Sequence, residues 1–176
     1  PPRRPRPGPV VVHLSHAFVV PGERGSGLAA WLRALPLAAA RRVARATGRG
    51  AEAEIVLVAE MEPPDPARPA RLPRLRSYQR AGFLLVDPLA APYAQPDFRE
   101  LAPGEAPRPI PLGLVLRRVG REHETLMPAA ELAAVVEAIY AVYAVHVAAA
   151  VLDPLREEAA FWTARTPTFR LLPPTA

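Results

Sequence analysis

The 176-residue chain contains no cysteine, no lysine and no asparagine. Without cysteine it cannot form a disulfide framework, a thiolate metal site or a cysteine nucleophile. All 22 basic residues are arginine, and together with abundant alanine and 24 prolines they indicate GC-rich coding. The net charge of +5 and the pI near 10.6 would otherwise suggest a nucleic-acid partner, but a coding preference for arginine produces the same values without one.

Aromatic residues and uninterrupted apolar runs are also scarce. Aromatic residues make up only 6% of the chain, which argues against a base-stacking surface and makes nucleic-acid binding unlikely to be the function. The most apolar stretch, residues 129–152, is interrupted by Glu131, Glu137 and His146, so we expect no membrane span. No secretory signal follows the proline- and arginine-rich residues 1–9, and we therefore expect a cytoplasmic protein.

The apolar residues, 50% of the chain, suffice for one domain with a substantial core, and their order predicts an α/β fold. A β-branched strand over residues 10–20 precedes an alanine-rich helix over residues 28–47, which Gly48 can end. The run EIVLVAEM, residues 54–61, is typical of a strand that is buried on both faces and pairs in parallel. The chain therefore opens with a strand, helix, strand unit.

The remaining segments predict a mixed central sheet with flanking helices. A short basic helix is expected over residues 74–81, and strands over residues 83–86 and 112–119. Residues 129–151 predict one long C-terminal helix with an apolar face formed by Leu132, Val135, Val136, Ile139, Val142 and Tyr143. The expected organisation is a leader (residues 1–9), a core (residues 10–119), and a C-terminal helix and tail that pack on or extend the core (residues 120–176).

The turn between the first strand and the first helix carries the clearest sign of function. Arg24, Gly25, Ser26 and Gly27 lie immediately before the helix that Leu28 begins. The first N–H groups of a helix have no intrahelical acceptor and lie at the positive end of its dipole, so a glycine-lined turn lets an anionic diphosphate approach them. Arg24 adds a cation beside that site. The turn therefore predicts a polyphosphate-binding site.

The same turn also fits a dinucleotide-binding pattern, because Gly25, Gly27 and Ala30 satisfy GxGxxA after a strand. That pattern expects an acidic residue about 20 positions later to bind a ribose hydroxyl. The first acidic residues after the glycines are Glu52 and Glu54, which come too late for that role. The dinucleotide interpretation is therefore the weaker of the two.

A longer pattern covers this turn, and a second one follows it. VxPxxRGxGxA is formed by Val19, Pro21, Arg24, Gly25, Gly27 and Ala29. It resembles the acyl-CoA pyrophosphate loop of the GNAT N-acetyltransferase superfamily. The segment YQRAGF, with Tyr78, Gly82 and Phe83, is similar to the YxxxGF signature that closes the next helix of that family. Both motifs occur in the expected order with one strand between them, and the resemblance covers about residues 10–119.

This resemblance implies the transfer of an acetyl or other acyl group from acetyl-CoA, or a related acyl-CoA, to an amine by direct attack, without a metal. The acceptor would be a small-molecule or peptide amine. Backbone groups at the end of the first strand, at Phe18 and Val19, would bind the pantetheine arm. The pyrophosphate would be held by the turn and the helix start, at Arg24, Gly25, Ser26, Gly27, Leu28, Ala29 and Ala30. A backbone amide near Val19 would also stabilise the developing oxyanion.

Tyr78 and Glu60 are the candidate catalytic residues. Tyr78 matches the family tyrosine that donates a proton to the departing CoA thiolate, and a phenol with a reference pKa of about 10 holds that proton at neutral pH. The alternative is that Tyr78 only packs against the sheet. Glu60 ends the second strand, near where the family often carries a glutamate base, although glutamates at strand ends are usually only solvated. His16 is a weaker candidate for the base, and His13, on the opposite strand face, is weaker still.

The chain departs from the family pattern at two places. It has no asparagine between the third core strand and the tyrosine helix, and it lacks the strands and helices that normally precede the pyrophosphate strand. We therefore expect an N-terminally incomplete core whose first strand has an unpaired outer edge. A truncated chain, which we favour, a second subunit that supplies the missing half, and coverage by the helix at residues 129–151 are the open explanations.

Two further alternatives concern what the chain does. If the acceptor pocket is missing, the chain would be a non-catalytic acyl-CoA-binding or interaction module. The open sheet edge and the apolar last helix also make a homodimer a fair expectation. Turnover without an added partner protein separates the enzyme from the binding module.

Overall fold

The computed structural model describes residues 8–15, 19–23, 25–65, 67–100, 102 and 104–175, apart from the side chains of Ala29 and Arg33. Its main element is a six-stranded sheet of order β1-β2-β6-β3-β8-β7. The strands are β1 (Val10–His13), β2 (Ile55–Met61), β3 (Leu84–Val86), β6 (Gly113–Arg118), β7 (Leu126–Pro128) and β8 (Thr168–Leu172). β1 and β2 are parallel and the other neighbours are antiparallel, so the predicted mixed α/β architecture is confirmed.

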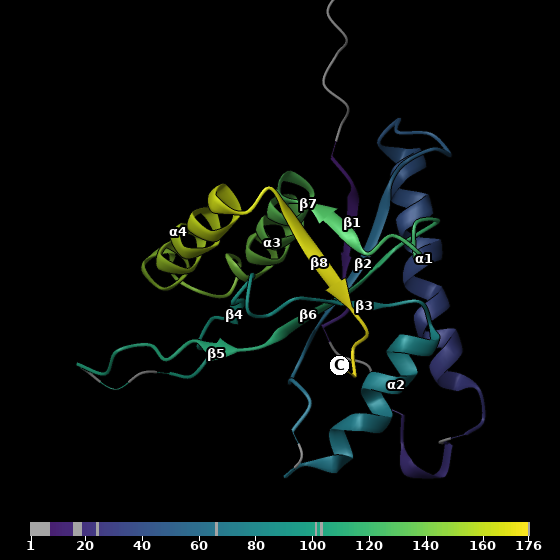
Figure 1. Cartoon of the computed structure of the whole chain (residues 1–176), viewed down its shortest axis with the longest axis horizontal. Coiled ribbons are helices and arrows are strands. Elements are labelled where there is room, and N and C mark those ends of the chain that lie inside the picture. The colour runs from purple at the N-terminus through teal and green to yellow at the C-terminus, as the bar shows by residue number, and fades with distance from the viewer. Residues whose placement is uncertain are drawn as a thin grey trace, which may run out of the picture.

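Helices cover both faces of this sheet (Figure 1). α1 (Leu28–Ala46) and α2 (Leu72–Arg80) lie on one face, and α3 (Ala129–Tyr143) and α4 (Ala149–Arg165) lie on the other. Side chains alternate along β2, so Val58 packs with the α3 and α4 residues whereas Leu57 packs with those of α1. The expected burial of this strand on both faces is therefore confirmed, and it follows from its continuous apolar run.

The first half of the chain follows the predicted elements closely. The helix expected over residues 28–47 is α1, and Gly48 follows its end in the left-handed region at φ 69°, as a helix stop requires. The basic helix expected over residues 74–81 is α2, which begins two residues earlier than predicted at Leu72. The strands expected over residues 83–86 and 112–119 are β3 and β6.

The first strand is shorter than predicted. The parallel ladder ends at His13, opposite Val58, and the N–H of Leu14 donates one further bond to the Val58 carbonyl at 2.7 Å. β2 continues beyond that point to Met61. β1 also forms one edge of the sheet, which agrees with the expected open edge of the first strand. The two parallel strands therefore part at Leu14, while β2 still has three residues to run.

Residues 19 and 20, where the first strand was expected to end, lie outside the sheet. Pro21–Glu23 form a single 3-10 turn, in which the N–H of Glu23 donates to the carbonyl of Val20 at 3.0 Å. Proline has no N–H for a strand ladder and favours the start of a helical turn. The strand prediction over residues 10–20 was therefore too long, because the apolar residues after His13 indicated a continued ladder, whereas the ladder ends at that residue.

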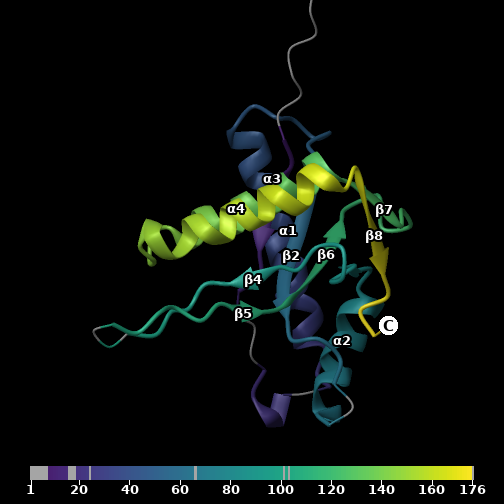
Figure 2. The ribbon, with the colours of Figure 1, turned by 60° about the vertical axis from the view of Figure 1, so that its left-hand side comes forward.

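The chain between β3 and β6 forms a projecting arm (Figure 2). β4 (Ala94–Gln95) and β5 (Ile110–Pro111) pair with each other as a separate two-stranded hairpin, which extends away from the sheet. β6 follows this arm and inserts between β2 and β3. At the base of the arm the buried carboxylate of Asp97 accepts a hydrogen bond from the side chain of Arg99 and another from the N–H of Arg108. The arm is thus closed at its base by one carboxylate.

The C-terminal third differs most from the prediction. Residues 129–151 form two helices instead of one, because α3 ends at Tyr143 and α4 begins only at Ala149. The reversal lets α4 bury Leu152 in the same core that α3 covers. One straight helix would have carried that residue away from the sheet. No described helix is long and apolar enough to cross a bilayer.

The predicted apolar face of α3 is correct except at one position. Val142 is 49% exposed, whereas Tyr140, which was not assigned to that face, is only 2% exposed. β7 and β8 were not predicted either. β8 pairs with β3 and carries alternating buried and exposed residues, among them Phe169 and Leu171 on the buried side. The C-terminal segment therefore extends the sheet.

Candidate functional site

A buried polar cluster surrounds the carboxylate of Glu60, close to the point where β1 and β2 part. We call it the Glu60 cluster. Its other members are His13, Tyr93, Gln95 and Tyr143. His13 Nε2 lies 2.9 Å from Glu60 Oε2, and the hydroxyl of Tyr93 donates to Glu60 Oε1 at 2.5 Å. Tyr143 also donates to Oε2, and Gln95 Nε2 lies 3.3 Å from that oxygen.

The register of the sheet explains why His13 reaches Glu60. In a parallel pair, residues in register share a face, and His13 is in register with Val58. Val58 and Glu60 are two positions apart on β2, so they also share a face. This is the face that α3 covers, where Tyr143 is the last helical residue and its ring lies 5.5 Å from that of His13. Three separate elements thus converge on one carboxylate.

Burial and hydrogen bonding act in opposite directions on Glu60. The side chains of Glu60 and His13 are each only 6% exposed. Burial raises the pKa of Glu60, but the hydrogen bonds from His13, Tyr143 and Tyr93 outweigh it and hold the pKa below its usual value. Burial, together with the neighbouring carboxylate, raises the pKa of Tyr93 and of Tyr143. The carboxylate is therefore ionised at neutral pH, and both phenols keep their protons.

The ionised carboxylate fixes the orientation of the imidazole proton. A carboxylate can only accept hydrogen bonds, so Nε2 of His13 must carry the hydrogen that faces Glu60 at 2.9 Å. In the neutral ring this leaves the lone pair on Nδ1. A proton taken up at Nδ1 would create a positive ring beside a negative carboxylate. His13 and Glu60 thus form a base oriented by an acid, an arrangement that suits removal of a proton from a substrate.

The backbone of Glu60 faces the opening between the strands. On β2 the carbonyls of Glu54 and Val58 accept hydrogen bonds from Val10 and Leu14 of the first strand segment. Backbone groups alternate in direction along a strand, so those of Glu60 point to the same side, past the last bond of the ladder. An extended ligand placed there can pair with the strand edge.

Tyr78 lies on the other face of the sheet. Its ring packs edge-on against Phe83, with centroids 4.9 Å apart. It contacts the cluster that contains Ala59, whose side chain points to the opposite face of β2 from that of Glu60. Leu14 packs against the same clusters as Tyr78. A group lying between β1 and β2 past Leu14 would therefore have Glu60 on one side and the Tyr78 face on the other.

The glycine turn before α1 has the conformation that its glycines allow. Gly25 and Gly27 have φ values of 91° and 87°, and this left-handed region favours glycine. Gly27 is the N-cap of α1 and has no side chain to cap the helix. The hydroxyl of Ser26 accepts a hydrogen bond from the N–H of Leu28 at 3.4 Å and donates to the carbonyl of Glu23 at 2.7 Å. The predicted turn and helix start are thus present, with backbone N–H groups at an exposed helix end.

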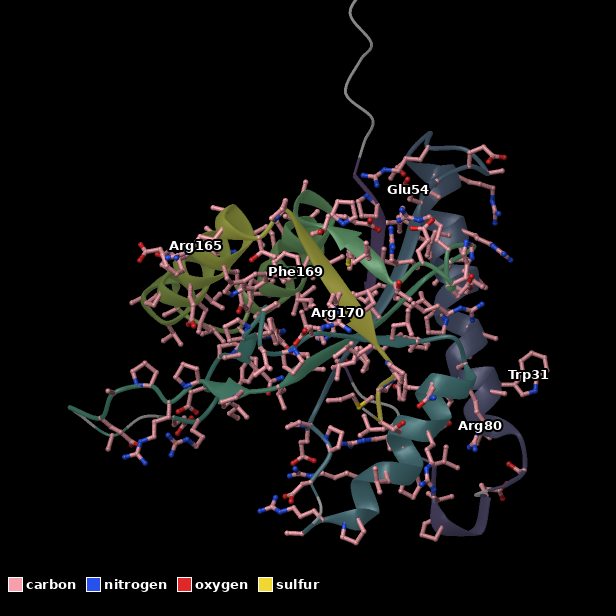
Figure 3. All side chains as sticks on the ribbon, viewed as in Figure 1. Trp31, Glu54, Arg80, Arg165, Phe169 and Arg170 are labelled. Carbon is pink, nitrogen blue, oxygen red and sulfur yellow. The ribbon has the colours of Figure 1, made fainter. Side chains whose placement is uncertain are left out.

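The remaining predicted pyrophosphate and pantetheine residues have mixed positions. Leu28 and Ala30 are exposed in the first turn of α1, which also contains Ala29, and Val19 is partly buried. Phe18, Arg24 and His16 lie outside the described residues. In the same helix Trp31 is 70% exposed and points away from the body of the molecule (Figure 3).

Of the Glu60 cluster, only Glu60 itself was predicted from the sequence as a catalytic residue. His13 was ranked lowest among the candidate bases, but the structure places it against Glu60. Knowledge of the register would have revealed it, because His13 pairs with Val58, which shares a strand face with Glu60. Tyr143 was assigned only to the apolar helix face. Tyr93 and Gln95 lie in an irregular proline-rich segment, where no periodicity marks the direction of a side chain.

Within the described part of the chain, no group of three His, Asp or Glu side chains is placed to hold a metal ion. Comparison with models of known protein families, with characterised proteins and with solved structures found no match. A function therefore has to be argued from the site itself.

Proposed function

We propose that this chain transfers an acyl group from acetyl-CoA, or a related acyl-CoA, to an amine, and that its core is GNAT-like. The observation that carries the proposal is the position of the His13–Glu60 pair at the point where β1 and β2 part. The glycine turn that opens α1 follows on the same connection. The base and the anion-binding turn thus belong to one strand, turn, helix unit.

The resemblance of the turn and of the YQRAGF segment to acyl-CoA-binding motifs indicates the cofactor. The pyrophosphate would accept hydrogen bonds from the N–H groups at the start of α1, where the helix dipole is positive. The pantetheine arm is an extended chain with two amides. It would pair with backbone groups near Val19 and with the open edge of β2 at Glu60.

The reaction requires a neutral amine. An ammonium group would lose one proton to Nδ1 of His13, and the carboxylate of Glu60, 2.9 Å from Nε2, would offset the charge formed on the ring. The amine nitrogen then attacks the thioester carbonyl, and the C–S bond breaks as the amide forms. The proton of Tyr78 would pass to the departing thiolate, and the second proton that the nitrogen loses as the amide forms would return to the Tyr78 phenolate through water. Base and acid would thus approach the reacting carbon from opposite faces of the sheet.

Binding of the cofactor is tested first, by the thermal shift with acetyl-CoA. At a concentration 100 times Kd, a ligand of the folded state adds about 2.7 kcal/mol of stability. The variant Gly27→Glu places a carboxylate at the anion site, and Gly50→Glu is its matched control. Both glycines have positive φ and open space around them, so both substitutions carry the same backbone strain.

We expect acetyl-CoA to stabilise the wild type and Gly50→Glu, but not Gly27→Glu. The absence of any shift in the wild type would overturn the proposal. Equal loss of the shift in both variants would show that the turn is not the binding site.

Turnover is tested separately with Glu60→Gln, which keeps the size of the side chain. Loss of general base catalysis lowers rates by about 10²- to 10⁴-fold. We expect that reduction in amine acetylation, with the thermal shift by acetyl-CoA retained. A wild-type protein that binds acetyl-CoA and acetylates no amine would instead be the non-catalytic binding module.

A further inference from the structure

A cavity of about 360 Å³ lies at the base of the projecting arm, next to the Glu60 cluster. A volume of this size suits a small organic molecule. Half of its ten lining residues are prolines, namely Pro63, Pro88, Pro92, Pro109 and Pro111. Tyr93 belongs both to the wall of the cavity and to the Glu60 cluster, because its hydroxyl donates to Glu60 Oε1 at 2.5 Å. The cavity and the Glu60 cluster therefore share one residue, Tyr93.

The wall of this cavity is poor in hydrogen-bond donors. Proline has no N–H, so the five prolines offer a ligand only ring carbons and carbonyl oxygens. The N–H of Leu112 donates to the carbonyl of Tyr93 at 3.1 Å, and the N–H of Tyr93 donates to the carbonyl of Ala91 at 2.8 Å. The Tyr93 hydroxyl is engaged by Glu60. Carboxylates and phosphates need donors, and this wall gives them few.

The one charged side chain among the described residues of the cavity wall, a carboxylate, favours a cationic ligand. Glu158 of α4 is exposed and lines the cavity. The nearest cation in sequence, Arg156, is already paired with Glu137 at 3.1 Å. A carboxylate beside an apolar wall with carbonyl acceptors attracts a group that donates hydrogen bonds and carries positive charge. Apolar carbon on the rest of the ligand would pack against the proline rings and Leu112.

We propose that this cavity binds a small primary amine. Its ammonium group is carried on a compact aromatic or branched aliphatic body. Binding of the cation follows from the lining alone. Its identification as the amine acceptor rests on the proposed acyl transfer, because the cavity adjoins the carboxylate that would orient the base. On that basis the enzyme acetylates apolar amines, and anionic amino acids are excluded from the cavity.

The test measures binding by isothermal titration calorimetry with no acyl-CoA present. The probes are 2-phenylethylamine and 3-phenylpropionate, which share an aromatic ring and a short chain but carry opposite charges. We expect the amine to bind at least tenfold more tightly than the carboxylate. Equal affinity for both probes, tighter binding of the carboxylate, or no binding of the amine at millimolar concentration would each overturn the proposal.

A matched pair of variants locates the amine. Glu158→Gln removes the carboxylate of the cavity wall, and Glu157→Gln removes its exposed neighbour on α4, which does not line the cavity. An exposed charge pair is worth about 0.2–1 kcal/mol, so Glu158→Gln should weaken amine binding about 1.4- to fivefold. Glu157→Gln should leave it unchanged. The same effect from both variants would show that the amine binds outside the cavity.

The two proposals fail in distinguishable ways. If the amine binds as expected but acetyl-CoA does not stabilise the wild type, the cavity keeps its ligand and the acyl transfer is wrong. If acetyl-CoA stabilises the wild type and the amine does not bind, the transfer stands and the acceptor belongs to another class.

Discussion

Two buried charged side chains, Arg118 and Glu60, lie under opposite ends of α3, and their charges are neutralised in different ways. Glu131 in the first turn of α3 pairs with Arg118 at 2.9 Å, and Arg118 also reaches Glu124. The last residue of the helix, Tyr143, instead donates to the carboxylate of Glu60. Arg118 and Glu60 are thus comparable in burial, with side chains 2% and 6% exposed, and differ in their partners.

Under the proposed function, the difference separates a structural charge from a reactive one. Arg118 keeps its charge at every accessible pH and is matched by two carboxylates. Glu60 is held mostly by neutral donors and by His13, whose second ring nitrogen, Nδ1, can accept a hydrogen bond. The charge of Arg118 is neutralised by carboxylates and takes part in no proposed proton transfer. The charge of Glu60 is held by hydroxyls, an amide and an imidazole, and in the proposed reaction it offsets the positive charge that a substrate proton creates on the imidazole.

Removal of the structural charge should have the largest effect on stability. The variant Arg118→Met removes the buried cation between Glu124 and Glu131 and leaves Glu131 with the more exposed Arg121 alone. The loss should therefore approach the cost of breaking a buried pair, about 3–5 kcal/mol. Urea unfolding at neutral pH would measure the loss. The double variant Arg118→Met with Glu131→Leu should recover much of it, because it removes both charges. A double variant as unstable as the single one would show that the pairing is not the cause.

Removal of one donor from the reactive charge should have a smaller effect that depends on pH. Tyr143→Phe deletes a hydrogen bond to Glu60 and should cost about 1–3 kcal/mol at neutral pH. The folded-state pKa of Glu60 lies below its unfolded value, so its contribution to stability is present at neutral pH and is lost as the pH falls through the folded pKa. The variant raises that pKa toward the unfolded value, so it should lose less stability than the wild type as the pH falls, and the cost of the substitution should shrink between pH 7 and pH 3.

Unfolding free energies between pH 3 and pH 7 test this shift, with Tyr140→Phe as the control. The Tyr140 hydroxyl donates to the carbonyl of Ala94 at 3.0 Å, so its removal costs a buried hydrogen bond without taking a donor from Glu60. The control should lose about 0.5–1.5 kcal/mol at all these pH values. Parallel pH profiles for the two variants would contradict the role given to Tyr143.

An exposed ion pair on the same helices should have the smallest effect. Arg156 pairs with Glu137 between α4 and α3, and the carboxylate side is mostly exposed. Solvent and salt screen such a pair, so Arg156→Gln should change stability by less than about 1 kcal/mol. A melting curve measured with and without 0.5 M salt would show it. A loss of stability as large as that of Arg118→Met would mean that solvent exposure does not determine how much each of the three charged sites contributes.

The sequence predicted the opening half of the fold because its signals there are local. The apolar run of β2, the alanine-rich α1 and the glycines beside it each specify their element without reference to distant residues. β8 was missed although Phe169 and Leu171 alternate with polar residues, because five residues at a chain end give a weak period. The break between α3 and α4 depends on packing against the sheet and has no proline or glycine to mark it.

The candidate site was predictable only in part for the same reason. Glu60 was found because it ends an apolar strand. His13 became a site residue through the parallel register, which joins residues 47 positions apart, and Tyr143 lies 83 positions from Glu60. Such contacts depend on how the elements assemble. The assignment of Tyr78 as the proton donor and of the turn as the cofactor site stays a prediction for the experiments above.

The insertion of β6 between β2 and β3 has a consequence for how the protein can change over evolutionary time. Both ends of the projecting arm enter neighbouring strands, and Asp97 ties its base together. The chain between Arg99 and Arg108 can therefore lengthen, shorten or change in composition without shifting the register of the sheet. The arm also supplies Pro109 and Pro111 to the cavity. The tip of the arm can thus change while the scaffold that holds Glu60, and the cavity residues at the base of the arm, are inherited unchanged.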